Sequence, residues 1–226
     1  MHRYLVTGTD TDVGKTRVAA ALGIALRDHG FEPTLIKLIQ TGTAEDTPGD
    51  AQRAGTLAGL RHRELARFWK AADPWSAALA EGMPPVHAED LKLVLDRIEG
   101  PIVAEGSGGV AVPLNRKQNF ADVAQLAQLR VVIAVGLRMG CISHALLTIS
   151  GLQERQLTIA GAVLVERWDA TEPDFREDVL RALSERVRIF GTLHHEVDER
   201  SSIEDGAKLF EPLFSAPDPE LIKSRR

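Results

Sequence analysis

The stretch GTDTDVGKT, residues 8–16, joins an apolar segment, RYLVT (3–7), to a segment with apolar residues at helical spacing (15–28). A strand that leads through a glycine loop into a helix brings free backbone N–H groups and the helix dipole to one point, where phosphates bind well. In such a loop Lys15 can reach the β- and γ-phosphates, and the Thr16 hydroxyl can ligate Mg²⁺. The alternative is a glycine turn with a capping threonine. Because strand, loop, GKT and helix seldom coincide by chance, we expect a phosphate-binding loop.

The loop departs from the usual pattern G-x-x-x-x-G-K-[ST], which would put a glycine at position 9. That position is Thr9, and the glycine is Gly8. The longer loop places extra polar side chains beside the γ-phosphate, as a second substrate would require. A Rossmann dinucleotide site fits poorly, because G-x-G-x-x-G is absent here. We assign the following loop residues to the nucleotide: Thr9, Asp10, Asp12, Val13, Gly14, Lys15 and Thr16.

Apolar strand-like segments alternate with helix-like segments along the rest of the chain. Strands are predicted at 3–7, 33–39, 101–105, 131–135, 157–165 and 188–193, and helices at 15–28, 50–57, 88–98, 142–152 and 175–183. Continuous apolar strands indicate a parallel sheet covered on both faces, a three-layer α/β/α fold of the P-loop NTPase type. The irregular region 59–85 is expected to be a looped or helical insertion that packs over the sheet. With 226 residues, we expect a single domain, 1–226.

Composition narrows the classes of partner. The net charge is −5 and no basic stretch is long enough to follow a phosphate backbone, so nucleic acid is not expected as a partner. No apolar run approaches the length that spans a bilayer, so no membrane partner is expected either. Cys141 is the single cysteine, which excludes an internal disulfide. Together with the lack of an N-terminal apolar signal segment, this predicts a cytoplasmic protein.

Three further stretches supply groups that a phosphoryl-transfer site needs. In IKLIQTG (36–42), Lys37 lies near the carboxyl end of a predicted strand, where ligands of open α/β sheets bind; a surface lysine is the alternative. In VAEGSGGVAVPL (103–114), Glu105 ends an apolar strand, where a carboxylate can hold Mg²⁺ directly or through water; a loop cap is the alternative. Asp50 is either a second carboxylate for the metal or a helix N-cap.

The third stretch, MGCISHALLT (139–148), also lies at a predicted strand-to-helix junction. Its backbone N–H groups could bind a carboxylate. Cys141 is expected to be a small buried residue rather than a reactive thiol, and His144 is expected to be structural.

Together these four stretches resemble the dethiobiotin synthetases. That family carries GTDTxVGKT, KPVxTG or KPVxSG, a VEGAGG-type turn and an LGCINHALLT-type segment, in this order and at similar spacings. NFADVA (119–124) also resembles the family's TFADLA-type element. The resemblance extends over residues 4–165 and is most specific in the loop and in GCISHALLT. The long loop is then the family's variant, whose extra residues contact the second substrate.

The resemblance implies an ATP- and Mg²⁺-dependent carboxylation of 7,8-diaminopelargonic acid by CO2. One amine becomes a carbamate, the γ-phosphoryl group activates it as a mixed anhydride, and the other amine closes the ureido ring of dethiobiotin. It implies that Lys15, Lys37 and Thr11 act in catalysis and that Thr16, Asp50 and Glu105 hold Mg²⁺. It implies the following substrate-binding residues: Thr11, Lys37, Thr41, Gly140, Cys141, Ile142 and Ser143. In the family the GCINH-type segment of the neighbouring subunit binds the substrate's carboxylate, which implies a homodimer with shared sites.

The chain departs from the family at several positions. Leu38 stands in place of the proline after the lysine, Ser143 in place of the asparagine of GCINH, and Asp12 where many members have glutamate. These changes leave the chemistry possible. Where the family often has an asparagine that reads the adenine, the chain has Val165 followed by Glu166 and Arg167, and His194 replaces a later proline. The nucleotide is therefore expected to be ATP or another nucleoside triphosphate.

Other members of the superfamily provide the alternatives. Amide-forming ligases such as the cobyrinic acid diamide synthases usually carry a glutaminase domain with a reactive cysteine, for which this chain has neither the length nor a second cysteine. Partition or cell-division switch proteins carry a second lysine early in the loop, and here the loop has Lys15 alone. A non-enzymatic paralogue is disfavoured by the intact Lys15, Thr16, Lys37 and Glu105. Phosphate release that depends on the diamine would separate the enzyme from both binding proteins.

Overall fold

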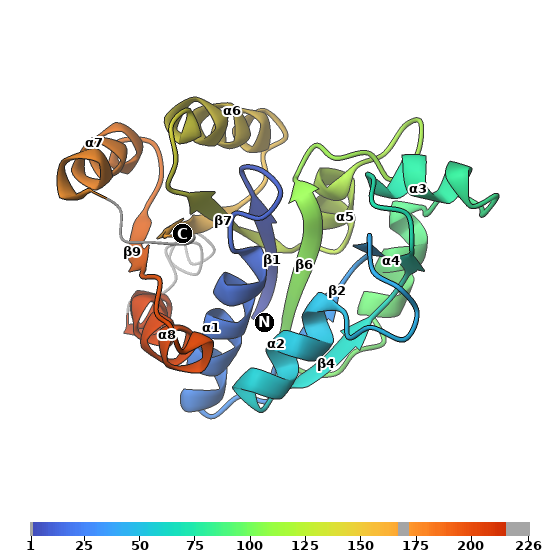
Figure 1. Ribbon diagram of the computed structural model, residues 1–226, viewed down its shortest axis with the longest axis horizontal. Coiled ribbons are helices and arrows are strands. Elements are labelled where there is room, and N and C mark those ends of the chain that lie inside the picture. The colour runs from blue at the N-terminus through green and yellow to red at the C-terminus, as the bar shows by residue number, and fades with distance from the viewer. Residues whose placement is uncertain (1, 167–171, 216–226) are drawn as a thin grey trace, which may run out of the picture.

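A seven-stranded sheet with the order β4-β2-β6-β1-β7-β8-β9 forms the middle of the fold in the computed structural model, which describes residues 2–166 and 172–215 (Figure 1). Every pairing in this sheet is parallel. Its strands are β1 (Arg3–Gly8), β2 (Thr34–Lys37), β4 (Arg61–Glu64), β6 (Ile102–Gly109), β7 (Arg130–Gly136), β8 (Ile159–Val165) and β9 (Ile189–Leu193). The predicted parallel sheet is confirmed.

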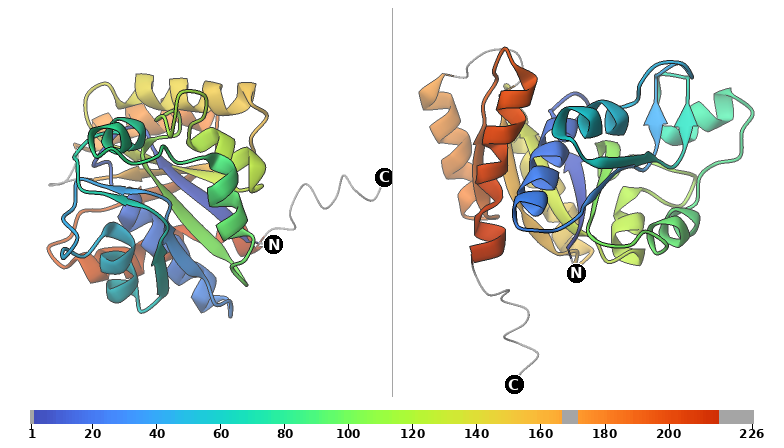
Figure 2. Two further views of the ribbon diagram at one scale, coloured as in Figure 1. Left: turned by 90° about the vertical axis from the view of Figure 1, so that its right-hand side faces the viewer. Right: turned by 90° about the horizontal axis from the view of Figure 1, so that it is seen from below.

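Helices cover both faces of this sheet, as the two views of Figure 2 show. One face carries α1 (Lys15–Asp28), α2 (Asp50–Ala58) and α8 (Glu199–Ala207). The other carries α4 (Ala88–Leu95), α5 (Phe120–Leu126), α6 (Cys141–Glu154) and α7 (Pro173–Ser184). Shorter elements are α3 (Pro74–Ala80), the 3-10 helix η1 (Lys208–Phe210) and α9 (Pro212–Ser215). The architecture is the predicted three-layer α/β/α arrangement.

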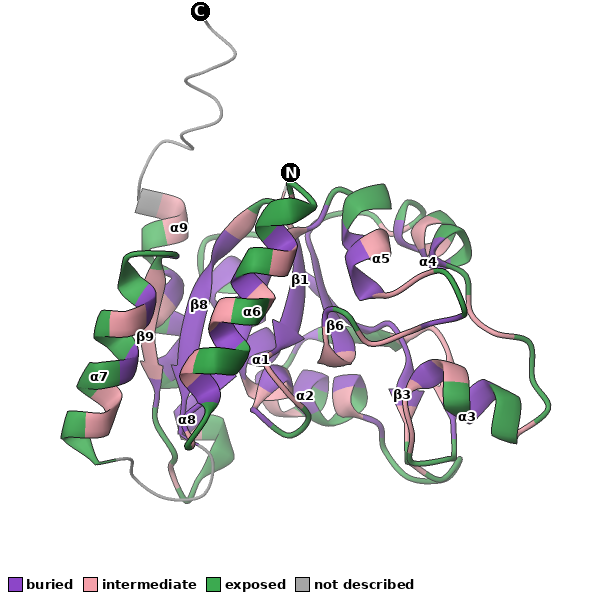
Figure 3. Ribbon diagram, turned by 90° about the horizontal axis from the view of Figure 1, so that it is seen from above, coloured by how far each residue is buried: buried purple, intermediate pink, exposed green. Residues whose placement is uncertain are grey.

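The apolar runs of the strands follow from burial on both faces. In β1, Tyr4 and Val6 point into the core beneath α1, and Leu5 points into the opposite core. All three side chains are fully buried. In Figure 3 the inner strands β1 and β8 are accordingly almost entirely buried, whereas the edge strand β9 is mostly intermediate and the outer face of α6 is exposed. A parallel strand with both faces covered therefore shows no alternation of apolar and polar residues.

The region 59–85 was expected to pack over the sheet as an insertion, but part of it belongs to the sheet itself. It supplies β4, an edge strand of the main sheet, and then β5 (Arg67–Phe68), which pairs with β3 (Gln40–Thr41) in a separate two-stranded sheet. The strand β4 has the sequence RHRE and is mostly exposed. Charged residues are common on edge strands because they deter pairing with other chains. The predicted strand 33–39 likewise ends at Lys37, and α4 ends at Leu95 rather than at residue 98.

Within the part of the chain that the structure describes, no helix is both long and apolar enough to cross a membrane.

Candidate functional site

The loop between β1 and α1 has a glycine at each end for steric reasons. Gly14 caps α1 in the left-handed conformation, with φ 88°, and a Cβ there would lie 2.6 Å from Cγ1 of Val165. A Cβ on Gly8 would lie 2.7 Å from the carbonyl oxygen of Asp10. Both distances are shorter than real Cβ contacts, so neither position accepts a side chain without movement. The glycine at position 8 therefore belongs to a longer, tightly folded loop.

The side chains of this loop divide into two groups. Asp10 fastens the loop, since its Oδ1 accepts from the N–H of Thr11 at 2.7 Å and its carboxylate forms an ion pair with Arg138. Val13 is fully buried, and the N–H of Thr9 donates to Ala134 on β7. Thr11 and Asp12 are exposed toward a cavity.

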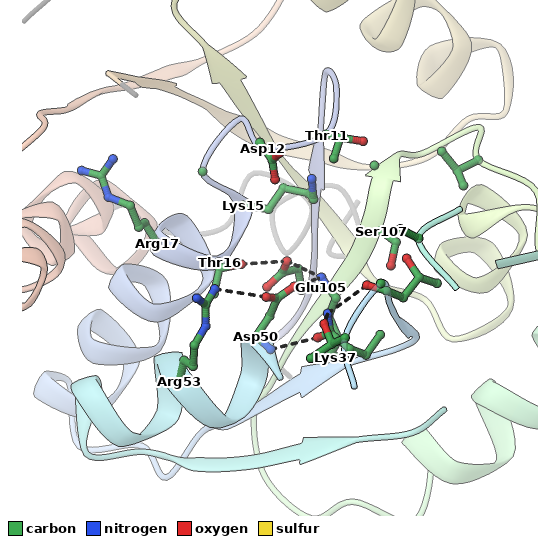
Figure 4. A pocket seen from close by; sticks show the side chains of 18 of the residues that line it. Thr11, Asp12, Lys15, Thr16, Arg17, Lys37, Asp50, Arg53, Glu105 and Ser107 are labelled. Carbon is green, nitrogen blue, oxygen red and sulfur yellow. Dashed lines mark hydrogen bonds and ion pairs between the residues drawn. The ribbon is translucent and has the colours of Figure 1, made fainter. Parts of the chain in front are cut away.

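This cavity has a volume of about 760 Å³ and lies at the carboxyl ends of β1 and β2, beside β6 (Figure 4). Nine residues predicted for the site line it: Thr11, Asp12, Gly14, Lys15, Thr16, Lys37, Thr41, Asp50 and Glu105. Seven others do not: Thr9, Asp10 and Val13, which hold the loop, and Gly140, Cys141, Ile142 and Ser143.

At the centre of the cavity Lys37 lies between two carboxylates. Its Nζ is 2.6 Å from Oε1 of Glu105 and 2.7 Å from Oδ2 of Asp50. The first contact follows from the sheet, because Lys37 and Glu105 are register partners on the parallel strands β2 and β6. Both of these side chains are about 95% buried, with 4% and 5% exposed. The alternative of a surface lysine is therefore wrong.

Burial and charge act in opposite directions on these groups. Burial alone would lower the pKa of Lys37, but the carboxylates of Glu105 and Asp50 outweigh it and raise that pKa. For Asp50 burial would raise the pKa, but the ammonium of Lys37 lowers it. Since the lysine pKa moves up and the aspartate pKa moves down, this pair is charged at neutral pH.

Lys15 is in a different electrostatic state. Burial lowers its pKa, the positive charge of Lys37 lowers it further, and Glu105 opposes both. Its Nζ donates to the carbonyl oxygen of Asp10 at 3.1 Å, and no described carboxylate pairs with it. A buried ammonium that faces a cavity without a counterion is suited to receive an anion.

Three oxygen-bearing side chains at the same place could hold Mg²⁺. The Thr16 hydroxyl donates to Oε1 of Glu105 at 3.0 Å, and Asp50 reaches the same lysine as Glu105. Among the described side chains no cluster of three or more His, Cys, Asp or Glu would hold a metal by itself. Mg²⁺ in phosphoryl-transfer sites, however, commonly takes one or two carboxylates and completes its shell with phosphate and water. The donor set therefore fits Mg²⁺ that arrives with a nucleotide.

The alternative roles of the two carboxylates, a helix N-cap for Asp50 and a loop cap for Glu105, are wrong. Gly49, not Asp50, is the N-cap of α2, and the Asp50 carboxylate points to Lys37 and to Arg53, 3.3 Å away. The Glu105 carboxylate contacts Thr16 and Lys37 rather than capping a loop.

Further lining residues were not singled out from the sequence. Gln40 orients Asp50, since its Oε1 accepts from the Asp50 N–H at 2.9 Å. Asp73, Ser107 and Glu199 also line the cavity. Gln40 lies within IKLIQTG (36–42), three residues after Lys37, so the sequence carried a usable signal for it. Asp73 stands directly before Pro74, a common way for a helix to begin, and that signal indicates a cap rather than a site.

The segment Gly140–Ser143 begins α6 at the carboxyl end of β7. Gly140 has φ 88° and caps the helix, and Cys141 is buried, as expected for a small structural cysteine. Gly140 and Ser143 are exposed. This segment therefore faces solvent and contributes nothing to the cavity of its own chain.

Arg17 marks the other end of the cavity from Lys37 (Figure 4). It donates to the carbonyl oxygens of Glu166 and His194 at 2.8 and 2.5 Å and to the Ser202 hydroxyl at 2.6 Å. Burial lowers its pKa. The Glu166 side chain is 3% exposed and lies 3.1 Å from Nδ1 of His194. Arg167, the third residue at this point of the sequence, lies outside the described residues.

Comparison with known proteins supports the same superfamily and a specific family. A protein-family model described as "AAA domain" matches residues 2–198. The ATP-dependent dethiobiotin synthetase BioD of Agrobacterium fabrum is 35% identical over 164 residues, which cover 72% of this chain and 74% of the relative. The protein of the same name from Rhodopseudomonas palustris is 38% identical over 192 residues, which cover 84% and 85%.

Solved structures share the fold. A MinC:MinD cell division complex from Aquifex aeolicus matches with a TM-score of 0.59 at 15% identity, over 97% of this chain and 98% of that one. A putative plasmid partition protein from Borrelia burgdorferi bound to AMPPNP matches with a TM-score of 0.57 at 12% identity, over 94% and 100%. These likenesses confirm the P-loop NTPase-type fold. Given the identities and coverage of the sequence relatives, the chain belongs to the ATP-dependent dethiobiotin synthetase family.

Proposed function

We propose that this chain is a dethiobiotin synthetase, which converts 7,8-diaminopelargonic acid, CO2 and ATP into dethiobiotin, ADP and phosphate. The observation that carries the proposal is the position of Lys37. Its ammonium lies between two carboxylates in a cavity that also contains the phosphate-binding Lys15. A carbamate and a transferring phosphoryl group are both anionic, so two neighbouring lysines stabilise the charge that develops between them.

Each residue then has a role that its contacts support. Lys15 and the N–H groups of the loop 9–16 bind the phosphates of the nucleotide. Thr16, Asp50 and Glu105 hold Mg²⁺, which when bound neutralises phosphate charge. Lys37 neutralises the carbamate oxygens.

Two threonines bind the second substrate in this proposal. Thr11 is exposed and Thr41 is half-buried, and both line the cavity. Both hydroxyls can donate or accept hydrogen bonds, so they suit amine and carbamate groups. Holding the carbamate between them in line with the γ-phosphate supplies the proximity that the reaction needs.

We further propose a homodimer, in which Gly140–Ser143 of each subunit completes the other's site by binding the substrate's carboxylate. This segment does not line the cavity of its own chain. Beside it, two large apolar side chains point into solvent, since Met139 is 86% exposed and Leu147 is 70% exposed. Exposed apolar surface of this kind is typical of interfaces. Light scattering should give twice 24.6 kDa, and a fully active monomer would contradict the proposal.

The same proposal includes a single domain over 1–226 and a cytoplasmic location. A continuous sheet from β4 to β9 supports the former. The use of ATP and the free, buried Cys141 support the latter.

The alternatives are an amide-forming ligase and a partition-type switch. The similarity to MinD and partition proteins lies at 10–17% identity and concerns the fold alone. The test is phosphate release by the purified protein with Mg²⁺ and bicarbonate, with and without 7,8-diaminopelargonic acid, using ATP, CTP and GTP in parallel. Release that requires the diamine supports the synthetase, and the ranking of nucleotides defines the base preference. Phosphate release that does not depend on the diamine, or no phosphate release at all, would exclude the synthetase.

A further inference from the structure

The substrate end of the cavity has a wall built from the segment 71–73. Ala71, Ala72 and Asp73 line the cavity together with Thr41. Gly42, which follows this threonine, packs closely against the wall, since a Cβ on it would lie only 3.2 Å from Cβ of Ala71. The Gly42 N–H also donates to the carbonyl oxygens of Phe68 and Lys70, each at 3.1 Å. Segment 71–73 is therefore fixed beside the proposed diamine site.

Asp73 occupies a defined position in this wall. It is the N-cap of α3, where its Oδ1 accepts from the N–H of Ser76 at 2.9 Å. The helix is anchored on its other side, since Pro74 is buried and the Trp75 N–H donates to the Pro113 carbonyl at 3.3 Å. This leaves Oδ2 of Asp73 with no hydrogen-bond donor from the described residues.

Among the described residues, no cationic side chain pairs with Asp73. The two carboxylates at the centre of the cavity, Asp50 and Glu105, both pair with Lys37. Asp73 forms no ion pair with any described lysine, arginine or histidine. The cavity-lining residues of segments 41–43 and 71–72 are uncharged, namely Thr41, Gly42, Thr43, Ala71 and Ala72. A single negative charge in such surroundings attracts a cation.

We propose that Asp73 binds the protonated amine of the diamine substrate. The inference rests on the proposed function and adds a specificity-determining residue to it. The amine that attacks CO2 must be neutral, whereas the second amine can remain protonated until the anhydride has formed. A carboxylate beside Thr41 would hold that second amine in place by a charge-assisted hydrogen bond. Asp73 thereby selects a substrate that carries a second cationic group near the first.

The test is Asp73→Asn, which keeps the size of the side chain and its capping ability, because asparagine caps helices as well as aspartate. We expect KM for the diamine to rise about ten- to a hundredfold, as for loss of one charge-assisted contact, with KM for ATP unchanged. Ethylenediamine should compete with the substrate in the parent protein and no longer in the variant.

The matched control is Asp198→Asn. Asp198 caps α8 in the same way, accepting from the N–H groups of Arg200 and Ser201, and it does not line the cavity. This variant should leave KM for the diamine unchanged.

The outcomes separate the two proposals. If the parent releases phosphate in response to the diamine and Asp73→Asn keeps the parental KM, this inference alone is overturned. Equal increases in KM for the diamine and for ATP would indicate a structural role and also overturn it. If the parent shows no diamine-dependent release, the proposed function fails and the inference fails with it.

Discussion

Replacement of Lys37 by methionine tests the electrostatic centre of the site. Methionine fills a similar volume without charge, so the packing around the stem is kept. The substitution leaves Glu105, whose side chain is 5% exposed, and Asp50 as neighbouring carboxylates without their shared cation. Removal of one partner from a buried pair costs about 3–5 kcal/mol of unfolding free energy. That is a large part of the total stability of about 5–15 kcal/mol for a typical domain.

Two further variants isolate the cause. Lys37→Met combined with Glu105→Gln removes the stranded buried charge, so most of the lost stability should return. Arg53→Met removes the exposed partner of the same Asp50, and because the Arg53 side chain is 64% exposed, the cost should be at most about 1 kcal/mol. Urea unfolding monitored by circular dichroism gives all of these free energies, provided that the m-value is unchanged.

The loss should also depend on pH. In the parent protein the ammonium of Lys37 lowers the pKa of Asp50. A carboxyl group whose pKa is lower in the folded than in the unfolded state contributes stability that is present above the unfolded-state pKa and is lost as pH falls through the folded-state pKa. The variant lacks this contribution, so the difference in stability between parent and variant should be smaller at about pH 3 than at about pH 7. A stability cost that is absent, independent of pH or unrelieved by Glu105→Gln would refute the electrostatic interpretation.

Two other substitutions follow from the phosphate loop. Lys15→Met should raise the melting temperature of the ligand-free protein by a few degrees, because burial lowers the pKa of Lys15 and the folded state therefore bears a cost for the charged lysine below that pKa. The stabilisation by nucleotide should be lost, so a thermal melt in which ATP raises the melting temperature of the variant as much as that of the parent would contradict this prediction. Gly14→Ala should lower the free energy of unfolding by about 1–2 kcal/mol because of the left-handed φ of 88°, and by more because the new Cβ would lie 2.6 Å from Val165. Nucleotide binding measured by calorimetry should be lost, and the additional change Val165→Ala should restore only the steric part of the stability.

Much of the fold can be predicted from the sequence, because strands covered on both faces are continuous apolar runs. RYLVT and VVIAV are of this kind and became β1 and β7. RHRE could not be predicted as β4, because an edge strand is stabilised by its backbone pairing with β2 and carries no apolar signal. The same limit applies to β5, whose two residues pair with β3.

The sequence predicted which residues belong to the site, but it could not predict which of them contact one another. Lys37 and Glu105 each end an apolar segment, which places both at the carboxyl edge of the sheet. Their contact depends on β2 lying next to β6, and strand order is a property of the tertiary structure. For Arg17 no local pattern exists, since its acceptors lie 149 to 185 residues away along the chain.

The backbone of Leu38 has a consequence for how the site responds to charge. Its N–H donates to the carbonyl oxygen of Glu105 at 3.0 Å, a bond that a proline at this position could not make. The ladder between β2 and β6 therefore continues one residue beyond Lys37, and both ends of the Lys37–Glu105 pair are attached to hydrogen-bonded backbone. This inter-strand hydrogen bond restrains the backbone directly after Lys37. Dipoles and charges held this way need little reorganisation when charge moves onto a substrate.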